Sequence, residues 1–226
     1  MGSIFDIIGP VMIGPSSSHT AGAARLGKMA RYIFKGEPKK VSLTLFGSFA
    51  KTYKGHGTDR ALLGGLLGFD AEDERIREAF KEAGEAGLKY EFVESTEEGG
   101  HPNEVRFDLY GDNRHHMVIV GRSLGGGRIM ITSINSLEVE ITGDDYTILT
   151  FHHDRPGVIA GVTALLGESG VNISSMRVFR KRKHCDAVML INTDSPVSEE
   201  VIATIQQGKD IESVMYFEPL EKAVNP

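Results

Sequence analysis

The last third of the chain shows a regular alternation of apolar and polar residues. Four runs alternate as half-buried strands do, over 146–152, 171–180, 186–193 and 211–218. Two stretches between them space their apolar residues as one face of a helix, over 158–166 and 196–205. The predicted order is strand–helix–strand–strand–helix–strand, which is the ferredoxin-like, split βαβ arrangement.

The preceding part of the chain mixes helices and strands less regularly. Residues 21–34 place Ala23, Leu26, Ala30 and Ile33 on one helical face. Gly143, Asp144 and Asp145 interrupt two strand-rich regions, so we predict an α+β protein with domains 1–143 and 146–226. The other predicted elements before residue 143 are strands over 41–49, 90–93, 105–110, 117–121, 128–132 and 137–141, and helices over 59–67 and 73–87.

Composition narrows the class of protein. The formal net charge of -6 argues against nucleic-acid binding, and no apolar run approaches the roughly 20 residues of a membrane span. No signal peptide is evident, so a cytoplasmic location is expected. The one cysteine, Cys185, is expected to be a small core residue, and a single cysteine excludes a self-contained iron–sulfur cluster. We interpret the basic run at 180–184 first as a solvated hairpin tip and second as a patch that binds an anion.

The most unusual segment is the run from Gly14 to Thr20. It gathers four hydroxyls, those of Ser16, Ser17, Ser18 and Thr20, around one imidazole at the start of a predicted helix. A helix N-terminus carries unpaired N–H groups and a partial positive charge, which suits a carboxylate or phosphate. Simple N-capping is the alternative, but a cap needs only one hydroxyl.

Three histidines lie in segments that are typical of loops, and we interpret them as one shared site. They are His19, His56 in Gly55–Asp59, and His101 in Gly99–Asn103. Imidazoles are suited to moving protons near neutral pH, although any single loop histidine is more often solvent-exposed and idle.

Neither a metal site nor a dinucleotide loop is predicted. No histidine or cysteine spacing typical of zinc occurs, and the adjacent pairs His115–His116 and His152–His153 would point to opposite faces of a strand. The glycine-rich segment Ser123–Gly127 lies between strands, so a flexible junction or a close backbone approach is expected there.

The C-terminal segment resembles an ACT domain, a regulatory module of amino-acid metabolism. The resemblance lies in the order of elements and in the runs Asp154–Val158 and Gly170–Ile173. It implies either an amino-acid site, commonly where two modules pair, or a module that only mediates pairing. The residues that this resemblance assigns to the site are Asp154, Pro156, Gly157, Val158 and Asn172.

The serine-rich run, the two other histidine segments and Ser123–Gly127 together resemble the β chain of iron–sulfur-dependent L-serine dehydratases. The resemblance implies deamination of L-serine to pyruvate and ammonia. A separate α chain would ligate a [4Fe-4S] cluster, which acts as a Lewis acid on the hydroxyl that leaves. It also implies an α2β2 assembly in which β chains pair through their ACT domains.

The resemblance assigns roles to the candidate residues. His56 is the first choice for proton transfer and His101 the second, while Ser16, Ser17, Ser18, His19, Thr20 and Asn103 would hold the substrate. The N-terminal domain is also similar to the allosteric substrate-binding domain of some phosphoglycerate dehydrogenases. Two alternatives therefore stay open, a regulatory subunit that binds serine without chemistry and a purely structural subunit.

Overall fold

The computed structural model describes residues 12–14, 16–97, 99–180 and 186–220. The chain divides into two compact units, Met1–Ser136 and Leu137–Pro226. The domain boundary near Gly143 stays a prediction. Cys185 and the basic residues 181–184 lie outside the described residues, as does Pro15. Within the described residues, no helix is long and apolar enough to cross a membrane.

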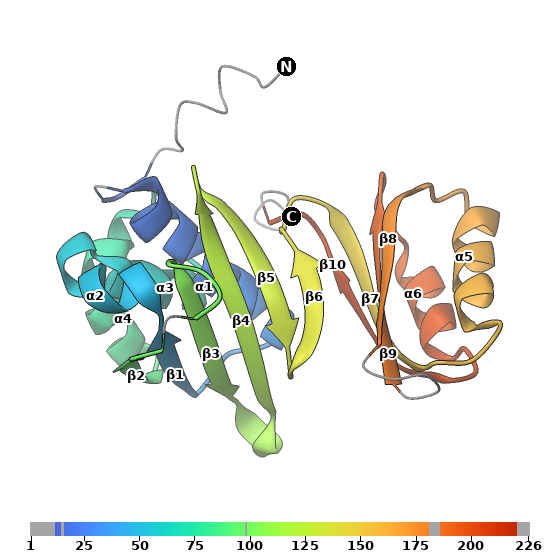
Figure 1. Ribbon diagram of the computed structural model, residues 1–226, viewed down its shortest axis with the longest axis horizontal. Helices are drawn as coiled ribbons and strands as arrows, with labels where there is room; N and C mark the ends of the chain where they lie inside the picture. Colours follow the sequence, from blue (N-terminus) through green and yellow to red (C-terminus); the bar gives the residue numbers. More distant parts are fainter. Residues whose placement is uncertain (1–11, 15, 98, 181–185, 221–226) are drawn as a thin grey trace. The chain divides into compact units, whose positions relative to one another are not determined.

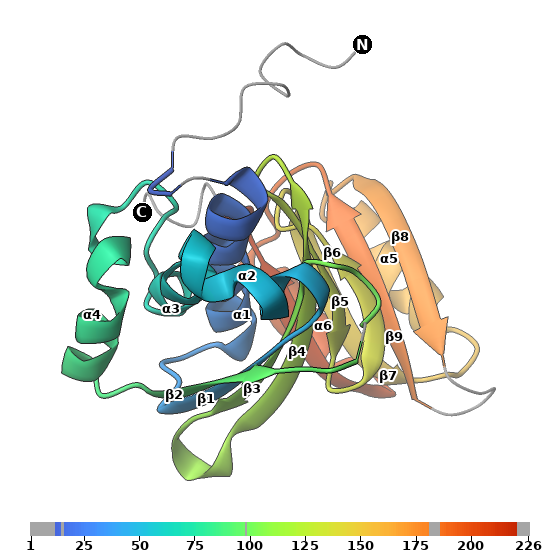
Figure 2. The ribbon, with the colours of Figure 1, turned by 60° about the vertical axis from the view of Figure 1, so that its left-hand side comes forward.

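The strands up to Ile141 form a six-stranded sheet with helices α1 to α4 on one side (Figure 2). The strand order is β2-β1-β3-β4-β5-β6, with β1 and β2 parallel and β3 and β4 antiparallel to their neighbours. The elements are η2 (Ser17–Ala21), α1 (Gly22–Phe34), β1 (Lys40–Leu45), α2 (Gly47–His56), α3 (Thr58–Leu66), η3 (Glu74–Glu78), α4 (Ala79–Glu85), β2 (Lys89–Glu94), β3 (Glu104–Tyr110), η4 (Asp112–Arg114), β4 (His116–Gly125), β5 (Arg128–Ile134) and β6 (Leu137–Ile141).

Helices α1 and α3 cross at very short range. A Cβ on Gly27 would lie 2.3 Å from the Leu62 carbonyl oxygen, and one on Gly65 would lie 2.0 Å from that of Ala24. Only glycine fits such an approach without moving backbone. The crossing fixes the start of α1 relative to the start of α3, and these two ends carry the serine-rich and Gly-His-Gly segments.

Two sequence predictions need correction in this half. The strand predicted over 41–49 ends at Leu45, because Gly47 has a φ of +55° and begins helix α2. The reason is tertiary, since the Ser48 and Phe49 amides donate to the carbonyl of Pro102. The helix predicted over 73–87 is a 3-10 turn (Glu74–Glu78) followed by α4. The helix predicted over 21–34 is confirmed, with its predicted apolar face fully buried.

The C-terminal half has the predicted βαββαβ order, and the α+β class is confirmed. Its strands form an antiparallel sheet in the order β10-β7-β9-β8, and both helices lie on one face of it (Figure 1). A core of buried aliphatic side chains, which includes Val162, Met189 and Ile205, joins helices to sheet. The elements are β7 (Tyr146–His153), α5 (Val158–Glu168), β8 (Ile173–Arg180), β9 (Asp186–Thr193), α6 (Glu199–Gln206) and β10 (Ile211–Phe217).

Candidate functional site

The serine-rich run forms one π-helical turn, Ser17–Ala21, that continues directly into α1. Ser16 is its N-cap: its hydroxyl accepts the His19 amide at 3.2 Å, and its carbonyl accepts the Thr20 amide at 2.9 Å. Capping therefore accounts for one of the four hydroxyls. The other three have different partners, so capping alone does not explain the run.

The glycine-rich hairpin between β4 and β5 supports this turn. The Ser123 hydroxyl donates to the Ser18 carbonyl at 2.9 Å, and the Gly126 amide donates to the Ser17 hydroxyl at 3.3 Å. A Cβ on Gly22 would lie 2.0 Å from Ser123 Oγ. A close backbone approach, one of the two expectations for this hairpin, is what the structure has, and it joins β4 to the start of α1.

His19 is buried at the centre of the site. Its Nδ1 lies 3.0 Å from Ser18 Oγ and its Nε2 lies 3.2 Å from Ser48 Oγ on helix α2. The ring meets those of Phe49 and His56 edge-on, with centroids 5.2 and 4.9 Å away. Burial, with a smaller contribution from His56, lowers the pKa of His19 below its ordinary value. His19 is therefore neutral at pH 7 and holds both ring nitrogens against hydroxyls.

His56 is exposed and lies beside His19. The prediction that it lies in a loop was wrong, because it is the last residue of α2. Gly57, with a φ of +69°, ends that helix and lets α3 begin at Thr58. The Thr20 hydroxyl donates to the His56 carbonyl at 3.4 Å. The structure thus brings two of the three predicted histidines into contact, and it leaves the imidazole of His56 accessible.

His101 lies in the predicted loop, just before β3, and is half-buried. Its Nδ1 accepts the Asn103 amide at 3.1 Å, which holds the ring over its own loop. The Pro102 carbonyl accepts the amides of Ser48 and Phe49 at 2.6 and 3.1 Å. The loop of His101 therefore caps the N-terminus of α2, the helix that carries Ser48 at its start and His56 at its end.

Two buried polar atoms near these motifs have no hydrogen-bond partner within the part of the chain that the structure describes, Thr58 Oγ1 and Asn103 Oδ1. Asn103 was predicted to bind substrate, whereas Thr58 was not singled out. A buried polar group without a partner is costly, so such atoms are suited to a bound ligand or water. Burial also raises the pKa of Asp59, next to Thr58.

Sequence reasoning missed Ser48. It falls inside the wrongly predicted strand, where an alternating pattern hides its place at the N-terminus of a helix. The signal that could have found it is Gly47, since a glycine that interrupts a strand pattern often marks a turn. Ser48 contacts His19 only because the Pro102 loop holds α2 in place.

His152 and His153 lie on opposite faces of β7, as predicted, whereas in the other pair only His116 lies in a strand, at the start of β4. His152 is 1% exposed and bonded to Thr150, whereas His153 is exposed beside Asp186 at 3.2 Å and Glu212 at 3.5 Å. These three exposed groups could reach one metal ion among the described residues. Their contacts are those of surface ion pairs, which protonated His153 would make with both carboxylates.

The structure divides the predicted ACT ligand residues between the two ends of the sheet. Asp154 follows the end of β7 and accepts from Arg180, while Asn172 precedes β8 and donates to Asp194. The eight residues of β7 separate these ends by roughly 23 Å. Gly157, with a φ of +94°, caps α5 beside Pro156 and Val158 at the Asp154 end. One copy of this module therefore does not gather the five residues into one pocket.

Comparison with known proteins agrees with this architecture. The profile described as "Serine dehydratase beta chain" matches residues 3–89, and that of the ACT domain matches residues 146–207. The chain is 44% identical to the probable L-serine dehydratase, beta chain, of Bacillus subtilis (strain 168), over 92% of this chain and 94% of that one. It is 38% identical to the L-serine dehydratase, beta chain, of Peptoniphilus asaccharolyticus, over 96% and 98%.

A third relative is of another kind. D-3-phosphoglycerate dehydrogenase of Synechocystis sp. is 28% identical over 81% of this chain, which spans 33% of that protein.

Fold and matches together define an ACT-containing protein whose first part is of the serine dehydratase type. The chain belongs to the family of L-serine dehydratase β chains, because it matches two of them over nearly their full lengths. The resemblance seen in the sequence is thereby confirmed. The serine dehydratase profile ends at residue 89, before the loop of His101 and the Ser123 hairpin, whereas the matches to the two β chains cover 92% and 96% of this chain.

Proposed function

We propose that this chain is the β subunit of a two-chain enzyme that deaminates L-serine to pyruvate and ammonia. In this reaction the α-proton and the β-hydroxyl leave, and the resulting aminoacrylate hydrolyses. The observation that supports the proposal is the contact between His19 and His56 at the start of the serine-rich helix. It places the accessible imidazole of His56, the proposed proton carrier, beside the proposed anion site.

The substrate carboxylate is proposed to bind at the start of η2. Ser16, Ser17 and Ser18 surround the first turn of a helical segment that runs on through α1, and its N-terminal N–H groups favour an anion. His19 is neutral, so it would contribute a hydrogen bond and shape rather than charge. Asn103 brings a buried carbonyl oxygen that has no partner among the described residues and is suited to the substrate amino group.

His56 is proposed to take the α-proton. It is exposed, so a substrate can reach its ring, and its carbonyl is held by Thr20 of the carboxylate site. His101 is the second choice, because its loop is bonded to the same helix.

The iron–sulfur cluster is proposed to belong to the α chain. A [4Fe-4S] cluster is held by several thiolates, and this chain has one cysteine, Cys185. The residues of this chain therefore do not suit the cluster. Lewis-acid chemistry at the leaving hydroxyl would come from the partner, while this chain would hold the carboxylate and move a proton.

The ACT module is proposed to pair β chains within an α2β2 assembly. Strand β8 ends the sheet order, and its Met176 and Val178 are 40% and 37% exposed. A sheet edge with exposed apolar side chains is suited to a second copy. A cytoplasmic location, as for other enzymes of amino-acid metabolism, stays a prediction.

A regulatory role is the alternative. The relationship to D-3-phosphoglycerate dehydrogenase favours it, since the same two-part region occurs there as a third of a chain with different chemistry. In that case the serine-rich turn would bind an amino acid, and His56 would take no part in turnover.

The deciding experiment is anaerobic pyruvate formation from L-serine, with this chain, with a cluster-loaded α chain, and with both. We expect turnover only in the mixture. His56→Ala should lower kcat by about 100-fold or more, because general acid–base catalysis contributes 10²–10⁴-fold.

His153→Ala is the matched control, since His153 is also exposed but lies on β7, and it should leave kcat unchanged. Full turnover by the His56→Ala mixture would instead support the regulatory subunit.

A further inference from the structure

An ion pair between a buried glutamate and a half-buried arginine lies directly beneath the loop of His101. Glu104 begins β3 and its side chain is 8% exposed, and Arg122 lies opposite it on β4. Arg122 Nε donates to Glu104 Oε2 at 2.7 Å, and the Gly100 amide donates to Oε1 at 3.1 Å. Both oxygens of a buried carboxylate are therefore engaged, one by a charged side chain and the other by the loop.

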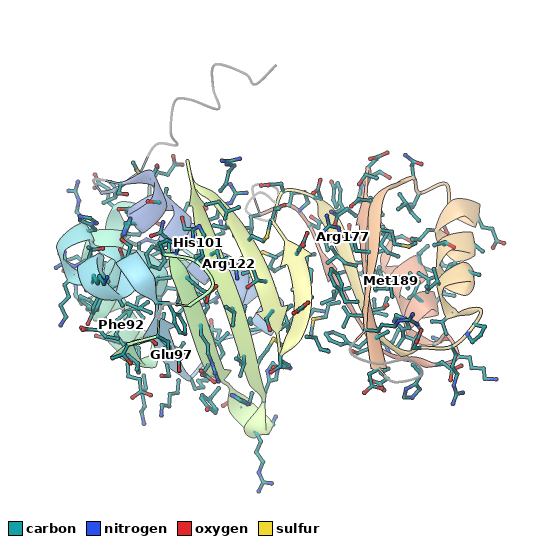
Figure 3. The ribbon with its side chains drawn as sticks, in the orientation of Figure 1. Phe92, Glu97, His101, Arg122, Arg177 and Met189 are labelled. Carbon is teal, nitrogen blue, oxygen red and sulfur yellow. The ribbon has the colours of Figure 1, made fainter. Side chains whose placement is uncertain are left out.

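The loop rests on this pair with little space between them. A Cβ on Gly100 would lie 2.4 Å from Arg122 Nη2, and one on Gly99 would lie 3.1 Å from Glu104 Oε1. Figure 3 labels both His101 and Arg122 in this region. Glu104 and Arg122 are therefore packed against the backbone next to His101, and Glu104 is bonded to it.

The same region is bonded to the rest of the site. The Glu104 carbonyl accepts the Phe46 amide at 3.0 Å, just before α2, and the Ser123 amide donates to the Asn103 carbonyl at 2.9 Å. Loop 99–103 is thus fixed to α2 on one side and to the hairpin that supports the serine-rich turn on the other.

A second ion pair on the same strand shows the contrast. The Arg106 guanidinium donates two hydrogen bonds to the Asp108 carboxylate, at 2.9 and 3.1 Å. Both residues lie on β3 itself, and Arg106 is 47% exposed. An exposed pair of this kind contributes little. Glu104–Arg122 differs because its carboxylate is buried and accepts a backbone amide of a candidate catalytic loop.

We propose that Glu104 and Arg122 form a positioning pair that holds His101 and Asn103 in their working place. The inference rests on the proposed function, since it requires that His101 take part in turnover. The pair touches no reacting atom and acts through the loop.

The test is a double-mutant cycle in the assembled two-chain enzyme. Glu104→Gln keeps the shape, but its amide cannot accept from both Arg122 and Gly100. We expect kcat/KM to fall by about 10- to 100-fold, because small misplacement of a reacting group costs that much. In the His101→Ala background the same substitution should cost no more than about twofold, since the two changes would remove one function.

Arg122→Lys keeps the positive charge, so kcat/KM should fall less than in Glu104→Gln. Arg122→Lys also serves as the test variant if Glu104→Gln folds poorly. Asp108→Asn is the matched control on the same strand and should change kcat/KM by less than about twofold.

Equal losses from Glu104→Gln with and without His101 would overturn the inference, because they would show a general structural role. Unchanged kcat/KM in Glu104→Gln, with His101→Ala impaired, would also overturn it and leave the proposed function standing. If His101→Ala alone keeps full turnover, the role proposed for His101 fails and the inference fails with it.

Discussion

At the scale of single residues, the two histidines in contact differ in their surroundings. His19 has hydroxyls at both ring nitrogens and a lowered pKa, whereas His56 is open to solvent. These surroundings suit the proposed roles, in which His19 orients the substrate and His56 exchanges protons. The difference between the two histidines follows from their burial, which cannot be deduced from the sequence motif.

The buried histidine predicts a pH dependence of folding. The pKa of His19 is lowered in the folded chain, so the unfolded chain binds more protons. The free energy of unfolding should therefore fall as the pH falls below about 6.5, down to the lower folded pKa. Urea titrations at about pH 7.5 and 5.5 would measure this loss.

His152, whose pKa burial also lowers, should add to the same loss. The raised pKa of Asp59 acts in the opposite direction, because between its raised folded pKa and the ordinary value of 3.8 the folded chain binds more protons. His19→Gln should reduce the difference in the free energy of unfolding between these two pH values, because it removes one of the groups whose pKa is lowered by folding. An unchanged difference in His19→Gln would contradict the assignment.

At the scale of elements, the sequence predicted most helices and strands but not the contacts that end them. Periodicity identified α1 and the whole βαββαβ module, because each buries a regular face. Periodicity wrongly extended the strand that begins at residue 41 beyond Leu45. A helix begins there instead, because the Pro102 carbonyl, distant in sequence, accepts two amides of the first turn of α2. The motifs located His19 and His56, while Ser48 and Glu104 depend on pairings between separate segments and gave no local signal.

The crossing of α1 and α3 leads to a stability prediction. Gly27→Ala would place a methyl group 2.3 Å from the Leu62 carbonyl oxygen, so the helices must separate. Overpacking of this kind costs about 1–3 kcal/mol. Urea denaturation should show that loss, and pyruvate formation should fall because the two helix starts carry the site.

Gly84→Ala is the control, since a Cβ there meets nothing within 4 Å on helix α4. It should stabilise the chain by about 0.5–1 kcal/mol, as alanine does in place of glycine in helices. A Gly27→Ala chain as stable as the wild type would show that the crossing tolerates separation.

At the scale of the whole molecule, the chain has a candidate site and a module suited to pairing. The iron–sulfur cluster is proposed to come from the α chain, and the pairing partner is proposed to be a second β chain. Met176→Asp on the edge strand β8 should weaken self-association, because it places a charge in the proposed apolar contact. Sedimentation velocity over a range of concentrations would show a shift toward monomer.

Ala203→Asp, which adds the same charge at an exposed position of α6, should leave association unchanged. Equal sedimentation of wild type and Met176→Asp would place the contact elsewhere.

The separation of Asp154 from Asn172 along the ACT sheet has a thermodynamic consequence. A small amino acid held by both residues must be shared by two copies, so only the associated form can bind it. Binding and association are then linked, and each strengthens the other by the same factor. The apparent affinity for such an effector would rise with the concentration of the protein itself, so the abundance of the subunit would influence the response of the module.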